Sequence, residues 1–317
     1  MQLSCISIQI MTKKLIGIIV VAIFAIIFAF ILKNKTDQKI TNSSPKLQIS
    51  TSFYPLYFFT TQIVGDKGDV KNITPVGGEP HDYEPTPQDI VTIQNGKLLI
   101  LNGGGLEVWA DKIKDQLKDK NVQVLVVGED LANQQVEEEG KNIQDPHIWL
   151  SPPLAKKMAG KIAQAIENVD PANKDYYEQN KNKLESRLDR LDSEYKQGLS
   201  NCKNINIITS HAAFGYLAST YGLKQVPISG LSPDAEPSAQ QLAEVTKFAR
   251  ENNVKYIFFE TLVSPKLAKT IAKEIGAQTL VLNPIEGLTD DEIKAGKSYT
   301  TVMEDNLKNL QIALECN

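Results

Sequence analysis

The sequence predicts an α/β protein of two pseudo-symmetric lobes, each a mainly parallel four-stranded sheet flanked by helices. Short β-rich runs alternate with helical patterns, which is typical of parallel α/β units. The alternation restarts after a long charged helix, which we expect to join the lobes rigidly. The chain has 317 residues and 42% hydrophobic content, enough for two domains of ordinary size. An apolar run near the N-terminus adds a hydrophobic anchor.

Four β-rich runs predict the sheet of the first lobe. A helical pattern over Leu106–Lys118 separates the last two runs and carries its apolar residues on one stripe. Before it, Gly103–Gly105 predicts a tight turn, because no Gly-Lys-Ser/Thr follows to complete a phosphate-binding loop. The predicted strands are Leu47–Phe53, Val70–Val76, Leu98–Asn102 and Val122–Gly128.

Two consecutive helices are predicted between the lobes. The first covers Pro152–Asn168, and Asp170 and Pro171 then provide an N-cap and a first helical residue for the second. The second helix is almost entirely charged or amide-bearing apart from one face, so we expect a rigid strut that prevents a wide hinge motion. That face is formed by Tyr177, Leu184, Leu188, Leu191 and Tyr195.

The second lobe repeats the pattern of strands and helices without a sequence-level repeat. Its predicted strands are Ile205–Ser210, Gln225–Ser229, Tyr256–Glu260 and Thr279–Leu282. Its predicted helices lie near Ala212–Tyr221, Ser238–Asn252, Pro265–Ile275 and Tyr299–Leu314.

The N-terminal segment has the features of an export signal. Leu15–Leu32 is unbroken apolar sequence that follows Lys13 and Lys14. Eighteen apolar residues are just enough to cross a bilayer core of about 30 Å, and no cleavage site or acylation cysteine follows them. We therefore expect an uncleaved membrane anchor rather than a cleaved signal peptide, with polar residues 33–46 as a flexible tether.

Cysteine placement and net charge limit the possible partners. Cys202 and Cys316 would be exported to a compartment where disulfides persist; the sequence leaves open whether they are paired or free. The net charge of -4 is too small to indicate a polyanionic partner, so no nucleic acid is expected.

The three histidines of the chain suggest a metal site. His81, His147 and His211 each lie at or just after the carboxyl end of a predicted strand, the edge where open α/β sheets bind ligands. Neutral imidazoles are good zinc ligands, and three of them leave one tetrahedral position for a carboxylate or water. Two carboxylates compete for that position, Glu260 and Glu286, and their spacing does not separate them.

Several segments resemble metal-specific solute-binding proteins of ABC transporters, in the ZnuA-like zinc branch. The resemblance covers the chain from Leu47 to its end, in the right order along both lobes. It is carried by GGEPHDYEPTPQD, DPHIWLSP, TSHAAFGYLASTYGL, GLSPDAEPSAQQL and LNPIEGLT.

The resemblance implies a particular ligand set. The first three ligand positions of the family fall on His81, His147 and His211, and the NPIEGLT-type ending matches its fourth ligand to Glu286. Manganese-binding relatives carry a carboxylate at the third position, so His211 favours zinc. Glu260 is then expected to hydrogen-bond a ligand imidazole, although an exchange with Glu286 stays open. Other candidates for such bonds, which also suit caps or turns, are Asp82, Asp145, Asp234 and Glu236.

The resemblance also implies a function. The chain is expected to be the extracytoplasmic binding subunit of a zinc importer, a monomer and not an enzyme, with an ABC permease and its ATPase as partners. The expected organisation is a cytoplasmic tip and anchor (1–32), the tether (33–46), metal-binding lobes (47–168 and 201–317) and a linker helix (169–200).

Alternatives remain at this level. One is a manganese- or iron-binding member of the same family; others are a membrane-anchored zinc hydrolase and an adhesin-like surface protein. The histidine-rich insertion of many relatives is missing. In its place stand Glu129, Asp130 and Glu137–Glu139, expected to form a solvated flexible loop that could also concentrate cations.

Overall fold

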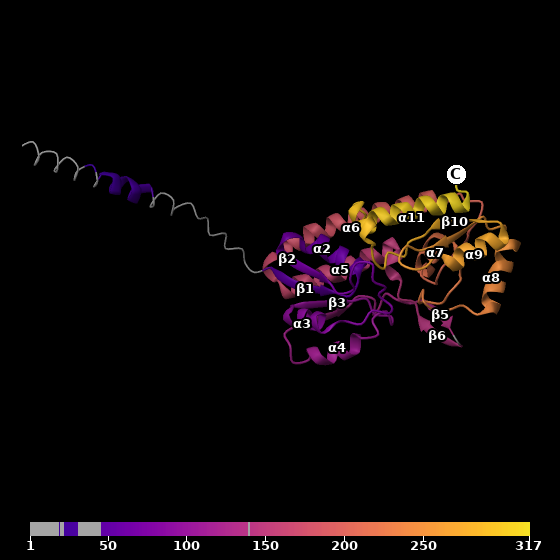
Figure 1. Cartoon of the computed structure of the whole chain (residues 1–317), viewed down its shortest axis with the longest axis horizontal. Helices are drawn as coiled ribbons and strands as arrows, with labels where there is room; N and C mark the ends of the chain where they lie inside the picture. Colours follow the sequence, from indigo (N-terminus) through magenta and orange to yellow (C-terminus); the bar gives the residue numbers. More distant parts are fainter. Residues whose placement is uncertain (1–18, 20–21, 31–45, 139) are drawn as a thin grey trace, which may run out of the picture. The chain divides into compact units, whose positions relative to one another are not determined.

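The computed structural model describes Ile19 and residues 22–30, 46–138 and 140–317 (Figure 1). Residues 46–317 form one compact unit. The predicted anchor and tether lie largely outside the described residues, although 22–30 are helical. Among the helices in the described part of the chain, none has the length and apolar character needed to cross a membrane.

The first sheet is fully parallel, with strand order β2-β1-β3-β4. Every residue of β3 is buried, as expected for an inner strand of a sheet covered on both faces. We call this sheet and its helices the first lobe. Its strands are β1 (Leu47–Thr51), β2 (Gly68–Asn72), β3 (Leu98–Leu101) and β4 (Gln123–Val126), and its helices are α2 (Tyr54–Val64), α3 (Pro87–Asn95), α4 (Ala110–Leu117) and α5 (Pro152–Val169).

The second sheet is also parallel, with order β10-β9-β7-β8. Counted from its own first strand, it has the same order as the first sheet, so the predicted pseudo-symmetry is confirmed. We call it, with its helices, the second lobe. Its strands are β7 (Asn206–Thr209), β8 (Lys224–Pro227), β9 (Tyr256–Phe259) and β10 (Gln278–Val281), and its helices are α7 (Gly215–Tyr221), α8 (Ala239–Glu251), α9 (Lys266–Ile275), α10 (Asp290–Lys294) and α11 (Tyr299–Leu314).

The long connecting helix is α6 (Lys174–Gly198), of 25 residues. At about 1.5 Å per residue it is roughly 38 Å long. Its buried face consists of the five side chains that the sequence predicts, and it contacts α2 and α5 of the first lobe and α11 of the second. The helix therefore packs along both lobes.

One apolar cluster contains buried residues of both lobes. The ring of Trp149 lies 4.6 Å from that of Phe53, and its indole N–H donates to the carbonyl of Pro284, 2.7 Å away. The Tyr299 hydroxyl donates to the Trp149 carbonyl at 2.5 Å. Because interiors are closely packed, this shared core resists a wide separation of the lobes.

Some element boundaries differ from the sequence predictions. Strand β2 covers Gly68–Asn72, since Ile73 and Thr74 follow as irregular chain bonded to the end of β1. Helix α4 begins at Ala110, after a longer glycine turn. Asp170 precedes a short 3-10 turn, η3 (Pro171–Asn173), and its carboxylate accepts from the hydroxyl of Tyr177.

The expected flexible acidic loop is instead partly ordered. Residues 135–138 and 141–144 form an antiparallel hairpin, β5 (Gln135–Glu138) and β6 (Lys141–Gln144); Glu139 lies outside the described residues. Asp130, before the hairpin, pairs with Lys161 of α5. Backbone pairing and side-chain contacts thus fix a segment whose composition alone indicates a solvated loop.

Candidate metal centre

His147 is held by the residues that precede it. It follows the β5–β6 hairpin in an Asp-Pro-His segment, and one oxygen of Asp145 lies 2.9 Å from its backbone nitrogen and 2.8 Å from its Nδ1. The proton shared with Asp145 therefore sits on Nδ1, and Nε2 presents its lone pair. The carbonyl of Pro146 accepts from the Asn102 amide at 2.9 Å. His147 is fully buried.

His211 is presented by the end of β7 in the second lobe. Its Nδ1 lies 2.6 Å from Oε1 of Glu260, which directly follows the neighbouring strand β9. The His211 carbonyl accepts from the Thr209 hydroxyl at 2.7 Å and from the Gln225 amide at 3.0 Å. Backbone and ring are both fixed, and Nε2 is again the free nitrogen.

His81 lies in the loop between β2 and α3, and its side chain is the one of the three that reaches solvent, at 10% exposure. Its backbone nitrogen donates to Oε1 of Glu79, 3.2 Å away. The second oxygen of Glu79 is buried without a hydrogen-bond partner. Burial, together with the negative charge of Glu286, raises the pKa of Glu79 to about 9.

Glu286 sits in a braced turn after β10. Asn283 accepts from the backbone nitrogen of Ile285 at 2.7 Å, while its own amide donates to Glu292 and its backbone pairs with Asn306 of α11. Ile285 has a φ of 60°, a strained value for a β-branched residue. The side chain of Asn283 is thus used in holding the turn, and Glu286 points inward from it with 1% exposure.

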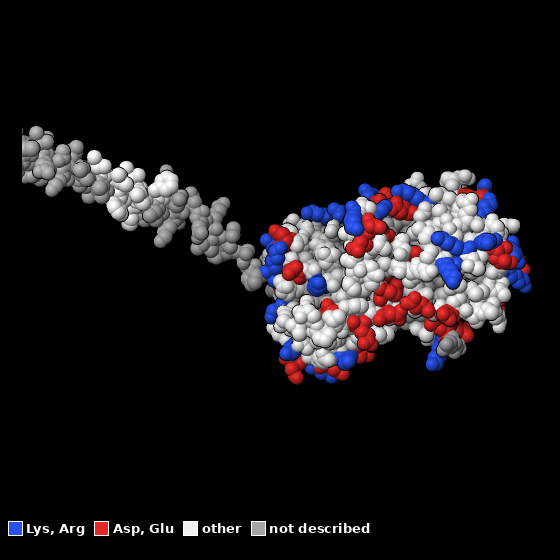
Figure 2. Space-filling view, in the orientation of Figure 1, with Lys and Arg blue, Asp and Glu red and all other residues white. Residues whose placement is uncertain are grey.

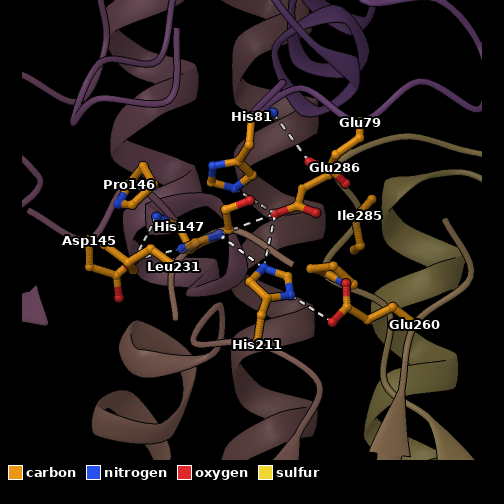
Figure 3. A network of polar contacts seen from close by, with 12 residues as sticks. Glu79, His81, Asp145, Pro146, His147, His211, Leu231, Glu260, Ile285 and Glu286 are labelled. Carbon is orange, nitrogen blue, oxygen red and sulfur yellow. Dashed lines mark hydrogen bonds and ion pairs between the residues drawn. The ribbon is translucent and has the colours of Figure 1, made fainter. Parts of the chain in front are cut away.

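These four side chains converge on one point (Figure 3). Oε1 of Glu286 lies 3.3 Å from Nε2 of His81, 3.1 Å from Nε2 of His147 and 3.3 Å from Nε2 of His211. The Nε2 atoms of His147 and His211 are 3.4 Å apart. A tetrahedral zinc site with bonds of about 2.0–2.1 Å has ligand-to-ligand edges of about 3.3–3.4 Å. These four separations therefore fit a zinc-sized cation, and all four ligand atoms lie within 4.8 Å of one another.

The electrostatics of the cluster favour positive charge. Burial by itself lowers the pKa of His211, but the carboxylates of Glu260 and Glu286 raise it well above its ordinary value. The carboxylates of Asp145 and Glu286 likewise outweigh burial and raise the pKa of His147. Burial alone would raise the pKa of Glu286, yet the imidazoles hold it well below its usual range. Protons or a metal cation can supply this charge.

The other residues singled out in the sequence lie around this centre. Asp145 and Glu260 orient the two buried imidazoles, as described above. Asp82 and Asp234 are exposed and approach each other, and the pKa of Asp234 is raised, first by its hydrogen bond with Asp82. Glu236 is exposed. Figure 2 shows Asp and Glu side chains gathered over the boundary between the lobes toward the hairpin, which agrees with a surface that concentrates cations.

Three residues near the centre are not identified from the sequence: Glu79, Asn102 and Asn283. Asn283 holds the turn that carries Glu286. A signal for Glu79 was present, because Glu79-Pro80-His81 repeats the acid-Pro-His arrangement of Asp145-Pro146-His147. The roles of Asn102 and Asn283 depend on contacts with segments distant in the chain, which spacing does not reveal.

Comparison with protein families gives one match over nearly the whole folded unit. Residues 49–313 match the family described as zinc-uptake complex component A, periplasmic. The chain is 42% identical to the high-affinity zinc uptake system protein ZnuA of Bacillus subtilis over 315 residues, which are 96% of this chain and 99% of that protein.

Two streptococcal proteins are also similar. The zinc-binding lipoprotein AdcA of Streptococcus pneumoniae is 41% identical over 91% of this chain, which spans 60% of AdcA. The crystal structure of its Zn(II)-bound ZnuA-like domain has a TM-score of 0.75 and 42% identity, covering 85% of this chain and 99% of that domain. The laminin-binding protein Lmb of Streptococcus agalactiae, described as bifunctional in adhesion and metal transport, has a TM-score of 0.76 and 35% identity over 84% of this chain and 99% of Lmb.

Proposed function

Because the chain belongs to the ZnuA family of zinc-uptake components, we propose that it captures one Zn²⁺ through His81, His147, His211 and Glu286. The family consists of transport binding proteins and not of enzymes. In this proposal the ion is the cargo of the protein, held until a membrane permease accepts it.

The observation that carries the proposal is the convergence of three imidazole nitrogens and one carboxylate oxygen, which all lie within 4.8 Å of one another. Three nitrogen donors suit zinc better than manganese, which prefers oxygen ligands. Four protein ligands also complete a tetrahedron, so no position is left for an activated water. This arrangement supports a binding protein over a zinc hydrolase.

We infer that residues 47–168 and 201–317 act as the two metal-binding lobes of a monomer, with 169–200 as the linker helix. His81 and His147 come from the first lobe, His211 and Glu286 from the second, so the ion bridges them. The shared core around Trp149 opposes wide opening, and a closed four-ligand site releases its metal slowly. Release then requires the permease to move the loops that carry the ligands, driven by its ATPase.

We further propose that the folded unit lies outside the cytoplasmic membrane, anchored by residues 15–32. The apolar run and the lysines before it support this, as does the periplasmic description of the family. The anchor is distinct from a lipid attached to a cysteine, because no cysteine directly follows the run.

The proposal is tested by zinc uptake in cells that lack the gene for this chain. Under zinc limitation, the wild-type gene should restore accumulation of radioactive zinc, and His211→Ala at equal abundance should not. A Glu137→Ala variant serves as the control, since this exposed carboxylate takes no part in the centre. Equal rescue by His211→Ala and wild type would contradict the proposal.

A further inference from the structure

The β5–β6 hairpin belongs to the first lobe in sequence but is bonded to the second lobe at two places. It leaves the first lobe after β4 and returns directly into the Asp145-Pro146-His147 segment. A displacement of the hairpin stem would therefore move Asp145, which holds the imidazole of His147.

The first attachment is the hydroxyl of Tyr216, which lies on α7 five residues after His211. It accepts from the backbone nitrogens of Asn133 and Gln134, at 2.8 and 2.9 Å, where the chain enters the hairpin. It also donates to the carbonyl of Asp145, 3.3 Å away, where the chain leaves it. One buried hydroxyl of the second lobe thus bonds both ends of a first-lobe hairpin.

The second attachment is near the tip of the hairpin. The Glu138 carboxylate accepts from the backbone nitrogen of Leu231, and a Cβ added at Gly230 would collide with the same carboxylate oxygen. The carbonyl of Gly230 in turn accepts from the nitrogen of Ala212 at 2.8 Å. Figure 3 shows Leu231 close to the His147 and His211 side of the centre.

We propose that Glu138 and Tyr216 are positioning residues that clasp the hairpin onto the second lobe and so slow the dissociation of Zn²⁺. The clasp joins the segment that carries Asp145 and His147 to the segment that carries His211. While it is closed, it opposes the separation of these two imidazoles; when it opens, each can leave the ion in turn. This inference rests on the ligand set proposed above.

The size of the effect follows from the bonds that are lost. A net hydrogen bond between protein groups corresponds to a factor of about 2 to 10 in an equilibrium or rate. Glu138→Ala removes one bond to the backbone of the second lobe, and Tyr216→Phe removes three with little change in volume. We expect zinc dissociation to accelerate about fivefold in the first variant and at least tenfold in the second.

The experiment measures the release of zinc from the zinc-loaded full chain into excess chromogenic chelator by stopped flow. Glu137→Ala is the matched control, since Glu137 is an exposed neighbour of Glu138 on the same strand, and should release zinc at the wild-type rate. Glu138→Gln keeps an acceptor oxygen for Leu231 and should restore most of the slow release. Wild-type rates in both Glu138→Ala and Tyr216→Phe would overturn the proposal.

Two further readouts separate the clasp from a general loss of structure. The new Cβ of Gly230→Ala should displace the Glu138 carboxylate and so break the same contact that Glu138→Ala removes. The effects of the two substitutions on the rate of zinc release should therefore not add; additive effects would contradict the assigned contact. Each clasp variant should still bind one zinc and give the wild-type Co²⁺ absorption spectrum. If the proposed ligand set itself were wrong, His211→Ala would still retain zinc although its clasp is intact.

Discussion

Replacement of Glu260 by Gln removes the negative charge beside His211 but keeps the size and shape of the Glu260 side chain. The carboxylate lies 2.6 Å from Nδ1 of His211, and both side chains are buried. The Gln carbonyl can still accept from Nδ1–H, so the ring keeps its orientation, but the imidazole becomes a weaker electron donor to the metal.

The expected loss of zinc affinity can be estimated, because mutating the hydrogen-bond partner of a metal ligand typically lowers metal affinity by about 10- to 100-fold. Because Gln preserves the hydrogen bond, Glu260→Gln should raise the Kd for zinc about tenfold, equivalent to about 1.4 kcal/mol. Glu260→Ala leaves a buried N–H without an acceptor and should approach 100-fold.

The assay is a competition titration against a chelator of known affinity, with the Co²⁺ spectrum as a check on geometry. Both variants should keep a tetrahedral spectrum, because Glu260 is not itself one of the proposed ligands. Complete loss of zinc in Glu260→Gln, with zinc retained in Glu286→Gln, would show that the two carboxylates have exchanged roles. Unchanged affinity in Glu260→Ala would show that the hydrogen bond between Glu260 and His211 does not contribute to zinc binding.

Three other predictions concern protons, the disulfide and the glycine turn. Neighbouring carboxylates raise the pKa of His147 and His211, so without metal these rings keep their protons to higher pH. Because zinc must displace those protons, titrations from pH 7 to pH 5 should show steadily weaker binding of zinc. Cys202 and Cys316, which the sequence leaves open as paired or free, form a disulfide across a sequence separation of 114. Replacing both by Ser should lower the free energy of unfolding in urea by about 2–4 kcal/mol with zinc stoichiometry unchanged. Gly104→Ala should weaken zinc binding, because the new Cβ would lie 3.1 Å from Cα of Pro146, whereas Gly105→Ala, which has a similar positive φ and open space, should affect stability alone.

Much of the fold follows from patterns that are local in the sequence. The buried face of α6 shows as a stripe of five apolar residues among charges, and each β-rich run corresponds to a strand. Helices α3 and α10 are short, and their clearest sequence signals are capping boxes at Thr86 and Thr289 rather than apolar periodicity. The β5–β6 hairpin could not be foreseen, because contacts with the second lobe help to order its acidic sequence.

The candidate centre was predictable to a similar degree. The chain has only three histidines, so the nitrogen donors could be named from the sequence, although His147 follows the β5–β6 hairpin rather than a strand of the first sheet. The fourth group could not be chosen by spacing, since both Glu260 and Glu286 follow strands of the second sheet. Their difference lies in tertiary contacts: Glu260 approaches Nδ1 of His211, while the turn braced by Asn283 directs Glu286 toward the Nε2 atoms.

The most direct test of the central claim is the zinc content of the purified chain by mass spectrometry, followed by zinc titration of stripped wild type, His211→Ala and Glu286→Ala. The proposed site predicts one tightly held zinc in the wild type and a large loss of affinity in both variants. Absence of stoichiometric zinc, or manganese in its place, would contradict it.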